Sequence, residues 1–164
     1  MTRFLIFVLV GMAALSGASG KVTSDDWVPV NVCHVRFLLP ANLKRTTRKG
    51  IDSCIAEFEN RKMLLSIDYG WYGGPARESD VTLDFREEAV SIGGKTGTIS
   101  TYVDNSLYAR NHPERKYVTH VYVVVKATPD ERASMTTSLM MEVRSESKKQ
   151  LQIAERIFRN VRFE

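Results

Sequence analysis

The sequence has no run of about 20 apolar residues, the length that a helix needs to cross a bilayer. Its longest apolar stretch covers only residues 4–15, at the N-terminus. After residue 20 the chain has no segment rich in Pro, Gly and Ser, no block of five like charges and no internal repeat. These absences exclude an integral membrane segment beyond the N-terminus, a disordered linker and a repeat protein. They favour one domain over residues 21–164.

Charge and catalytic motifs are equally sparse. The formal net charge is +4, which is too mild to predict nucleic-acid binding. His34, His112 and His120 have no histidine partner at i+2 or i+4, so no metal site is predicted. No Gly-x-Ser-x-Gly elbow and no phosphate-binding glycine loop are present. The sequence therefore predicts no cofactor, no metal and no catalytic residue.

One set of acids keeps a secreted hydrolase open as an alternative. Glu57, Glu59 and Asp68 stand on two strands that are predicted to pair, where carboxylates can meet as an acid and a base. The distance between the carboxylates decides such chemistry, and sequence does not supply it. Alternating acids on a strand are more often its solvated face, so we expect that the protein is not an enzyme.

The first 20 residues have the three parts of a signal peptide. Arg3 supplies the positive charge, the apolar stretch follows, and Ala18-Ser19-Gly20 places small residues at positions −3 and −1 of a cleavage site. Ser16-Gly17-Ala18 offers a second cleavage register two residues earlier. The sequence thus predicts a secreted or periplasmic protein whose mature chain begins near Lys21.

Only two cysteines, Cys33 and Cys54, occur in the sequence. Paired thiols stay oxidised in an extracytoplasmic compartment, so export predicts a disulfide between them. Their separation is far from the Cys-x-x-Cys spacing of redox sites, and no Cys or His cluster completes a zinc site. Closing a loop of about 20 residues should stabilise the fold by about 3 kcal/mol in the chain-entropy model.

Alternation of apolar and polar residues predicts a strand-rich domain. The predicted strands are 35–39, 52–60, 62–69, 87–92, 95–103, 116–126 and 138–144. Gly93-Gly94 is typical of a two-residue hairpin loop, because both positions need positive φ. Residues 116–126 are rich in valine on both faces, which is typical of a central strand.

One helix is predicted near the C-terminus, over residues 147–159. Ser145 or Ser147 can cap its N-terminus. Its apolar face consists of Leu151, Ala154, Ile157 and Phe158. The extended segment Val161-Arg162-Phe163 is predicted to close the sheet edge or the core. The sequence thus predicts an α+β fold, an antiparallel sheet with packed helices that ends in one helix and a short closing strand.

Four short segments resemble the PsbP-like superfamily in order and layout, over about 120 of the mature residues. They are Phe37-Leu38-Leu39-Pro40, Ser66-Ile67-Asp68-Tyr69-Gly70, Val90-Ser91-Ile92-Gly93-Gly94, and Gln152-Ile153-Ala154-Glu155-Arg156-Ile157 followed by Asn160-Val161-Arg162-Phe163. The resemblance implies an antiparallel sheet between helices and a role as a non-enzymatic accessory factor. It supplies no catalytic residues. The Cys33 and Cys54 pair is not a general feature of that superfamily.

The segment from Asp68 to Pro75 is the main candidate for a recognition site. Asp68, Tyr69, Trp71 and Tyr72 stand there among glycines, and aromatic side chains in such loops offer rigid contact area to a partner. In the alternative, Trp71 covers the end of the sheet and Tyr69 packs beneath the helix. Residues 104–115 are a second candidate, as a long loop without structure of its own.

These observations favour an exported accessory protein that binds an unknown protein partner through its surface. A small-ligand or lipid carrier is the first alternative, with an apolar cavity lined by Phe58, Leu139 and Met140. The secreted hydrolase is the second alternative. A flat aromatic surface, an apolar cavity or converging acids would distinguish the three.

Overall fold

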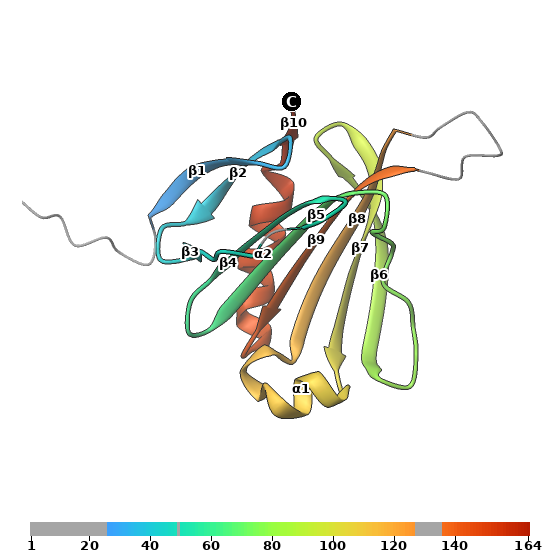
Figure 1. The fold of residues 1–164 in the computed structure, drawn as a ribbon. Coiled ribbons are helices and arrows are strands. Elements are labelled where there is room, and N and C mark those ends of the chain that lie inside the picture. Colours follow the sequence, from blue (N-terminus) through green and yellow to red (C-terminus); the bar gives the residue numbers. More distant parts are fainter. Residues whose placement is uncertain (1–25, 49, 127–135) are drawn as a thin grey trace, which may run out of the picture.

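The computed structural model describes residues 26–48, 50–126 and 136–164, and the predicted signal peptide lies outside them. Two antiparallel sheets organise this part of the chain (Figure 1). The larger sheet has the strand order β3-β4-β5-β9-β8-β7-β6, and the smaller has the order β1-β2-β10. The strands are β1 Trp27–Val32, β2 Val35–Pro40, β3 Lys44–Arg45, β4 Cys54–Glu59, β5 Met63–Gly70, β6 Thr82–Ile92, β7 Lys95–Asp104, β8 Tyr117–Lys126, β9 Thr137–Ser145 and β10 Arg162–Phe163.

Four short helical segments connect or cover these strands. They are α1 Leu107–Asn111, the 3-10 turn η1 Pro113–Arg115, the 3-10 turn η2 Lys148–Gln150, and α2 Leu151–Arg159. The predicted C-terminal helix is confirmed, but its α-helical part begins four residues later than expected. Ser147 precedes η2 and its side chain makes no capping hydrogen bond.

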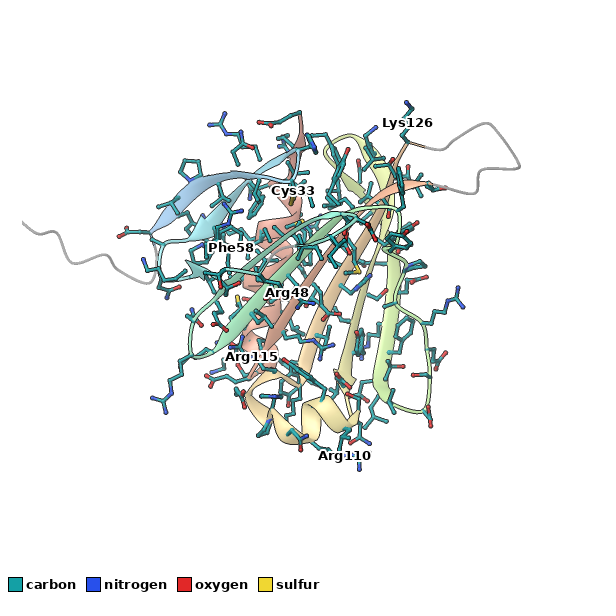
Figure 2. The ribbon with its side chains drawn as sticks, viewed as in Figure 1. Cys33, Arg48, Phe58, Arg110, Arg115 and Lys126 are labelled. Carbon is teal, nitrogen blue, oxygen red and sulfur yellow. A yellow bond between two sulfur atoms is a disulfide. The ribbon has the colours of Figure 1, made fainter. Side chains whose placement is uncertain are left out.

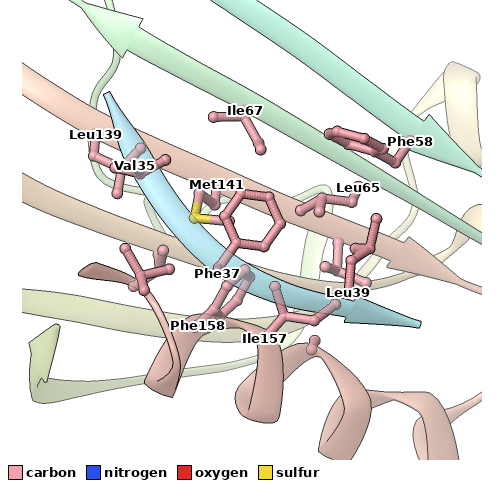
Figure 3. Packing of buried hydrophobic residues seen from close by; sticks show 14 of the residues in the cluster. Val35, Phe37, Leu39, Phe58, Leu65, Ile67, Leu139, Met141, Ile157 and Phe158 are labelled. Atoms are coloured by element: carbon pink, nitrogen blue, oxygen red, sulfur yellow. The ribbon is translucent and has the colours of Figure 1, made fainter. Parts of the chain in front are cut away.

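The core lies on one face of the seven-stranded sheet. Successive side chains of a strand point to opposite faces, so alternate residues such as Leu65 of β5 and Met141 of β9 share the core face. The strand β2 and the helix α2 cover this face with Phe37 and Phe158, which are almost fully buried. Figure 3 shows these four side chains meeting in one apolar cluster.

The predicted α+β fold with packed helices is wrong. The described residues are mostly strand, and α2 is their only helix of more than five residues. The small sheet β1-β2-β10 covers much of the core face that helices were expected to cover. Sequence reasoning missed β1, which contains Pro29. Because β1 is an edge strand, the missing N–H of Pro29 breaks no ladder in the sheet.

Most of the predicted strands are present in the structure. The hairpins β4–β5 and β6–β7 form as expected, and Gly93 and Gly94 both have positive φ. The valine-rich strand β8 lies inside the large sheet, between β9 and β7. The C-terminal segment pairs with β2, so it extends the edge of the small sheet rather than the large one. Residues 104–115 were predicted as a loop without structure, and this prediction is wrong because they contain α1 and η1.

Candidate functional site

Three large apolar side chains are exposed at the end of the sheet where β4 begins and β5 ends. Ile51 is 99% exposed, Tyr72 70% and Trp71 51%. Ile51 and Trp71 line a shallow hollow of about 330 Å³, and Tyr72 follows Trp71 in the chain. The lining of the hollow consists of His34, Ile51, Asp52, Ser53, Cys54, Tyr69, Gly70, Trp71 and Thr137. We call the hollow and the three exposed side chains the aromatic end.

A strained turn forms one wall of the aromatic end. Cys33 and His34 are the two-residue loop between β1 and β2, with φ of 51° and 58°. Such loops favour Gly, Asn or Asp, because positive φ brings Cβ close to the backbone. The disulfide from Cys33 to Cys54 and the packing of the His34 ring on Tyr69, 5.2 Å between centroids, hold the turn in place. Strained backbone held by its surroundings is common at binding sites.

The four residues predicted as a recognition site do not form one surface. Tyr69 and Trp71 line the hollow, and Tyr72 follows them at the surface. Asp68 points to the opposite face of β5, where it pairs across the sheet with Ile55 and Met140. Its Oδ1 atom is buried and has no hydrogen-bond partner among the described residues.

Sequence reasoning missed two contributors to the aromatic end. Ile51 is an isolated apolar residue between Gly50 and Asp52, which fits no strand pattern and could have marked it as exposed. His34 comes from a strand hairpin that is distant in the sequence. Its position depends on the β1–β2 turn, and β1 was not predicted.

The face of the large sheet opposite the core holds a row of polar residues that crosses six strands. Cross-strand pairing places them side by side, one from each of β4, β5, β9, β8, β7 and β6. They are Glu57, Ser66, Glu142, His120, Ser100 and Glu87, and we call them the polar row. Such residues normally face water, yet His120 and Ser100 are buried.

A segment of irregular chain covers one part of the polar row. Residues 71–81 connect β5 to β6 and cross the sheet on this face (Figure 1). The Ser138 hydroxyl donates to the carbonyl of Gly73. The Nε2 atom of His120 lies 3.0 Å from the carbonyl oxygen of Gly74 and donates to it, because a carbonyl can only accept. Residues 71–81 therefore cover His120, which is buried. A half-buried side chain had been predicted at this position.

An ion-pair network is centred on Arg144, next to the polar row. Arg144 donates to Glu142 and to Asp104, both at 2.6 Å. Burial opposes the charge of Glu142, but its contact with His120, 3.6 Å from Nδ1 to Oε2, and the charge of Arg144 outweigh the burial and lower the pKa of Glu142. Burial likewise opposes ionisation of Asp104, and hydrogen bonds from Arg144 and Ser106 lower its pKa. Both carboxylates are therefore ionised at neutral pH.

Beside this network lies a polar pocket of about 190 Å³. Its lining consists of Arg48, Glu57, Leu64, Ser66, Tyr108, Glu142 and Arg144. Arg48 and Ser66 both donate to Oε1 of Glu57, at 2.5 and 3.2 Å. The guanidinium of Arg144 lies 4.9 Å from the ring centroid of Tyr108. Figure 2 shows the end with Cys33 far from the end with Arg110 and Arg115, where α1 and η1 lie.

The order Ser100, His120, Glu142 in the polar row has the residue types of a nucleophilic triad. Ser100 is fully buried, however, and its hydroxyl donates to Glu87. The Nε2 atom of His120 is already bonded to the backbone, so it cannot take a proton from a nucleophile in this arrangement. The hydrogen bonds of Ser100 and His120 hold the sheet and its covering segment together.

The three residues expected to line a carrier cavity do not lie together, and two of the three candidate acids are paired with arginines. Phe58 and Leu139 are packed in the core, whereas Met140 faces the other side of the sheet, so the three do not line one cavity. Among the candidate acids, Glu57 is paired with Arg48, and Glu59 lies 3.4 Å from Arg115.

Within residues 26–48, 50–126 and 136–164, no group of three or more His, Cys, Asp and Glu side chains is placed to hold a metal ion. None of the helices in these ranges has the length and apolar character that a membrane span needs. No protein-family model matches the chain, and no curated protein matches its sequence significantly.

Proposed function

We propose that this is an exported, non-enzymatic accessory protein that binds another protein through its aromatic end. The supporting observation is the exposure of Ile51 and Trp71 in the lining of one hollow, with the exposed Tyr72 next to Trp71 in the chain. Exposed apolar side chains that stand singly on a surface need no explanation, but a contiguous group marks an interaction site. The proposed partner presents a complementary apolar patch to this end.

The chemistry of the aromatic end suits a protein interface. Trp and Tyr supply large contact areas with few rotatable bonds, and they are enriched among the side chains that dominate binding energy. The hollow is shallow, and the disulfide and the Cys33–His34 turn support its wall. A preformed surface of this kind loses little entropy on binding. The PsbP-like resemblance agrees with an accessory role, and the disulfide is consistent with export.

Truncating either aromatic side chain should strongly weaken partner binding. We expect Trp71→Ala and Tyr72→Ala each to weaken binding about thirtyfold or more, the effect of losing a side chain that dominates an interface. The measurement is capture of the partner from the extracytoplasmic fraction of producing cells by the full chain, followed by affinity measurement with the purified pair.

Leu107→Ala provides the matched control. Leu107 is 70% exposed, as Tyr72 is, but it lies in α1 at the other end of the sheet. This variant should bind within twofold of the wild type. Binding that persists unchanged in Trp71→Ala and Tyr72→Ala, or that Leu107→Ala reduces equally, would refute the proposed surface.

A further inference from the structure

The polar pocket is a second candidate site, separate from the aromatic end. It lies on the face of the sheet that α2 does not cover, and β4, β5, β9 and α1 contribute its lining. We propose that it binds a single uncharged sugar ring, either free or as the end of a glycan. This inference goes beyond the protein-binding function and does not depend on it.

The charges of the pocket favour a neutral ligand. Its two carboxylates, on Glu57 and Glu142, are each paired with a guanidinium inside the pocket, at 2.5 and 2.6 Å from Arg48 and Arg144. A phosphate or carboxylate ligand would meet both acids, and a cationic ligand would meet both arginines. A neutral molecule avoids either repulsion.

The hydrogen-bonding groups of the pocket match hydroxyls. A carboxylate only accepts and a guanidinium only donates, whereas a hydroxyl does both. The bonds from Arg48 and Ser66 both end on Oε1 of Glu57, so Oε2 is the oxygen placed to accept from a ligand. Neighbouring hydroxyls of one sugar ring can donate to this carboxylate and accept from its arginine at the same time. Arginine and carboxylate side by side thus suit a polyol better than a ligand with a single polar group.

The size and walls of the pocket limit the ligand to one ring. Drug-sized ligands occupy pockets of about 300 Å³ or more, and this pocket has about 190 Å³. Leu64 supplies an apolar wall against which the C–H groups of a sugar can pack. Tyr108, held against Arg144 and His112, is half-exposed at the rim. Its ring contacts fix its position, so the pocket has a rigid edge near the ligand.

Nuclear magnetic resonance titration of the full chain tests this site. The probes are the methyl glycosides of glucose, galactose and mannose, and N-acetylglucosamine. Their disaccharides, added separately, distinguish a free sugar from a glycan end. At least one probe should shift the backbone amides of Ser66, Tyr108 and Glu142, whereas sodium phosphate and methylammonium should not. No shift at these amides with any sugar, or stronger binding of phosphate, would overturn the assignment.

Two matched variants test the role of Arg48. Arg48→Met removes one guanidinium and leaves the pocket with excess negative charge, so sugar affinity should fall about tenfold. Lys62→Met is the control, because Lys62 has the same exposure as Arg48 and is also paired with a glutamate, but lies outside the pocket. It should leave sugar affinity within twofold. Equal affinities of the Arg48→Met variant and the wild type would contradict the site, provided that the amide spectrum shows both folded.

Discussion

Replacing Arg144 by methionine is expected to lower the free energy of unfolding by about 3 kcal/mol near pH 7. Arg144 bonds two carboxylates that are themselves largely buried, Glu142 and Asp104. Methionine fills a similar volume but leaves both acids without their cation, and an uncompensated buried charge is costly. Urea denaturation followed by tryptophan fluorescence measures the change, because Trp27 packs beneath Arg156 in the folded protein.

The same variant should change how stability depends on pH. The pKa values of Glu142 and Asp104 are lowered in the folded protein, so their contribution is complete at neutral pH and is lost as pH falls through the lowered values. Without Arg144 the burial of both acids is no longer offset, and their pKa values rise. The gap in stability between wild type and Arg144→Met should therefore shrink as pH decreases from about 7 to about 3.

Lys62→Met is again a suitable control. The pair of Lys62 with Glu146 is exposed to solvent, so losing it should cost less than about 1 kcal/mol. If Arg144→Met costs no more than Lys62→Met, or if its stability gap from the wild type is the same at both pH values, the buried ion-pair network does not stabilise the fold as described.

Removing the disulfide is the second change with a large expected effect. Cys33 and Cys54 are 21 residues apart, and a cross-link of that span restricts the unfolded chain by about 3 kcal/mol. The link also holds the Cys33–His34 turn, whose positive φ values favour opening. The double variant Cys33→Ser with Cys54→Ser should lose about this much stability in urea denaturation, and wild type under reducing conditions should lose the same amount.

The double serine variant and chemical reduction of the wild type serve as controls for each other. Reductant added to the double serine variant should cause no further loss, because no disulfide remains to be reduced. Partner binding at the aromatic end should also weaken in the double variant, since His34 and Tyr69 lose their fixed position. Unchanged stability of the wild type after complete reduction would show that the disulfide contributes little to the fold.

Most of the strands, the hairpin glycines and the disulfide could be predicted because each has a signal in the sequence. Alternation marked β4 and β5, Gly93-Gly94 marked a turn, and two cysteines behind a predicted signal peptide marked a disulfide. The fold class could not be predicted from such signals. Whether helices or a second sheet cover the core depends on where β1 and β10 pair, and β1 carries a proline that hides its strand character.

The candidate sites also differ in whether the sequence marks them. Trp71 and Tyr72 stand out in the sequence because three aromatics crowd one turn-rich segment. The polar row does not, because its members come from six strands and meet only through the registers between strands. Asp68 was grouped with its neighbours in the sequence, although alternation within β5 places it on the other face from Tyr69.

Site-specific photo-crosslinking tests the proposed function most directly. A benzophenone amino acid replaces Tyr72 at the aromatic end or Leu107 at the opposite end, in the full chain within producing cells. The proposed surface predicts one discrete crosslinked partner protein from position 72, absent from position 107 and lost when Trp71→Ala is added. The same products from both positions, or none from position 72, would contradict binding through the aromatic end.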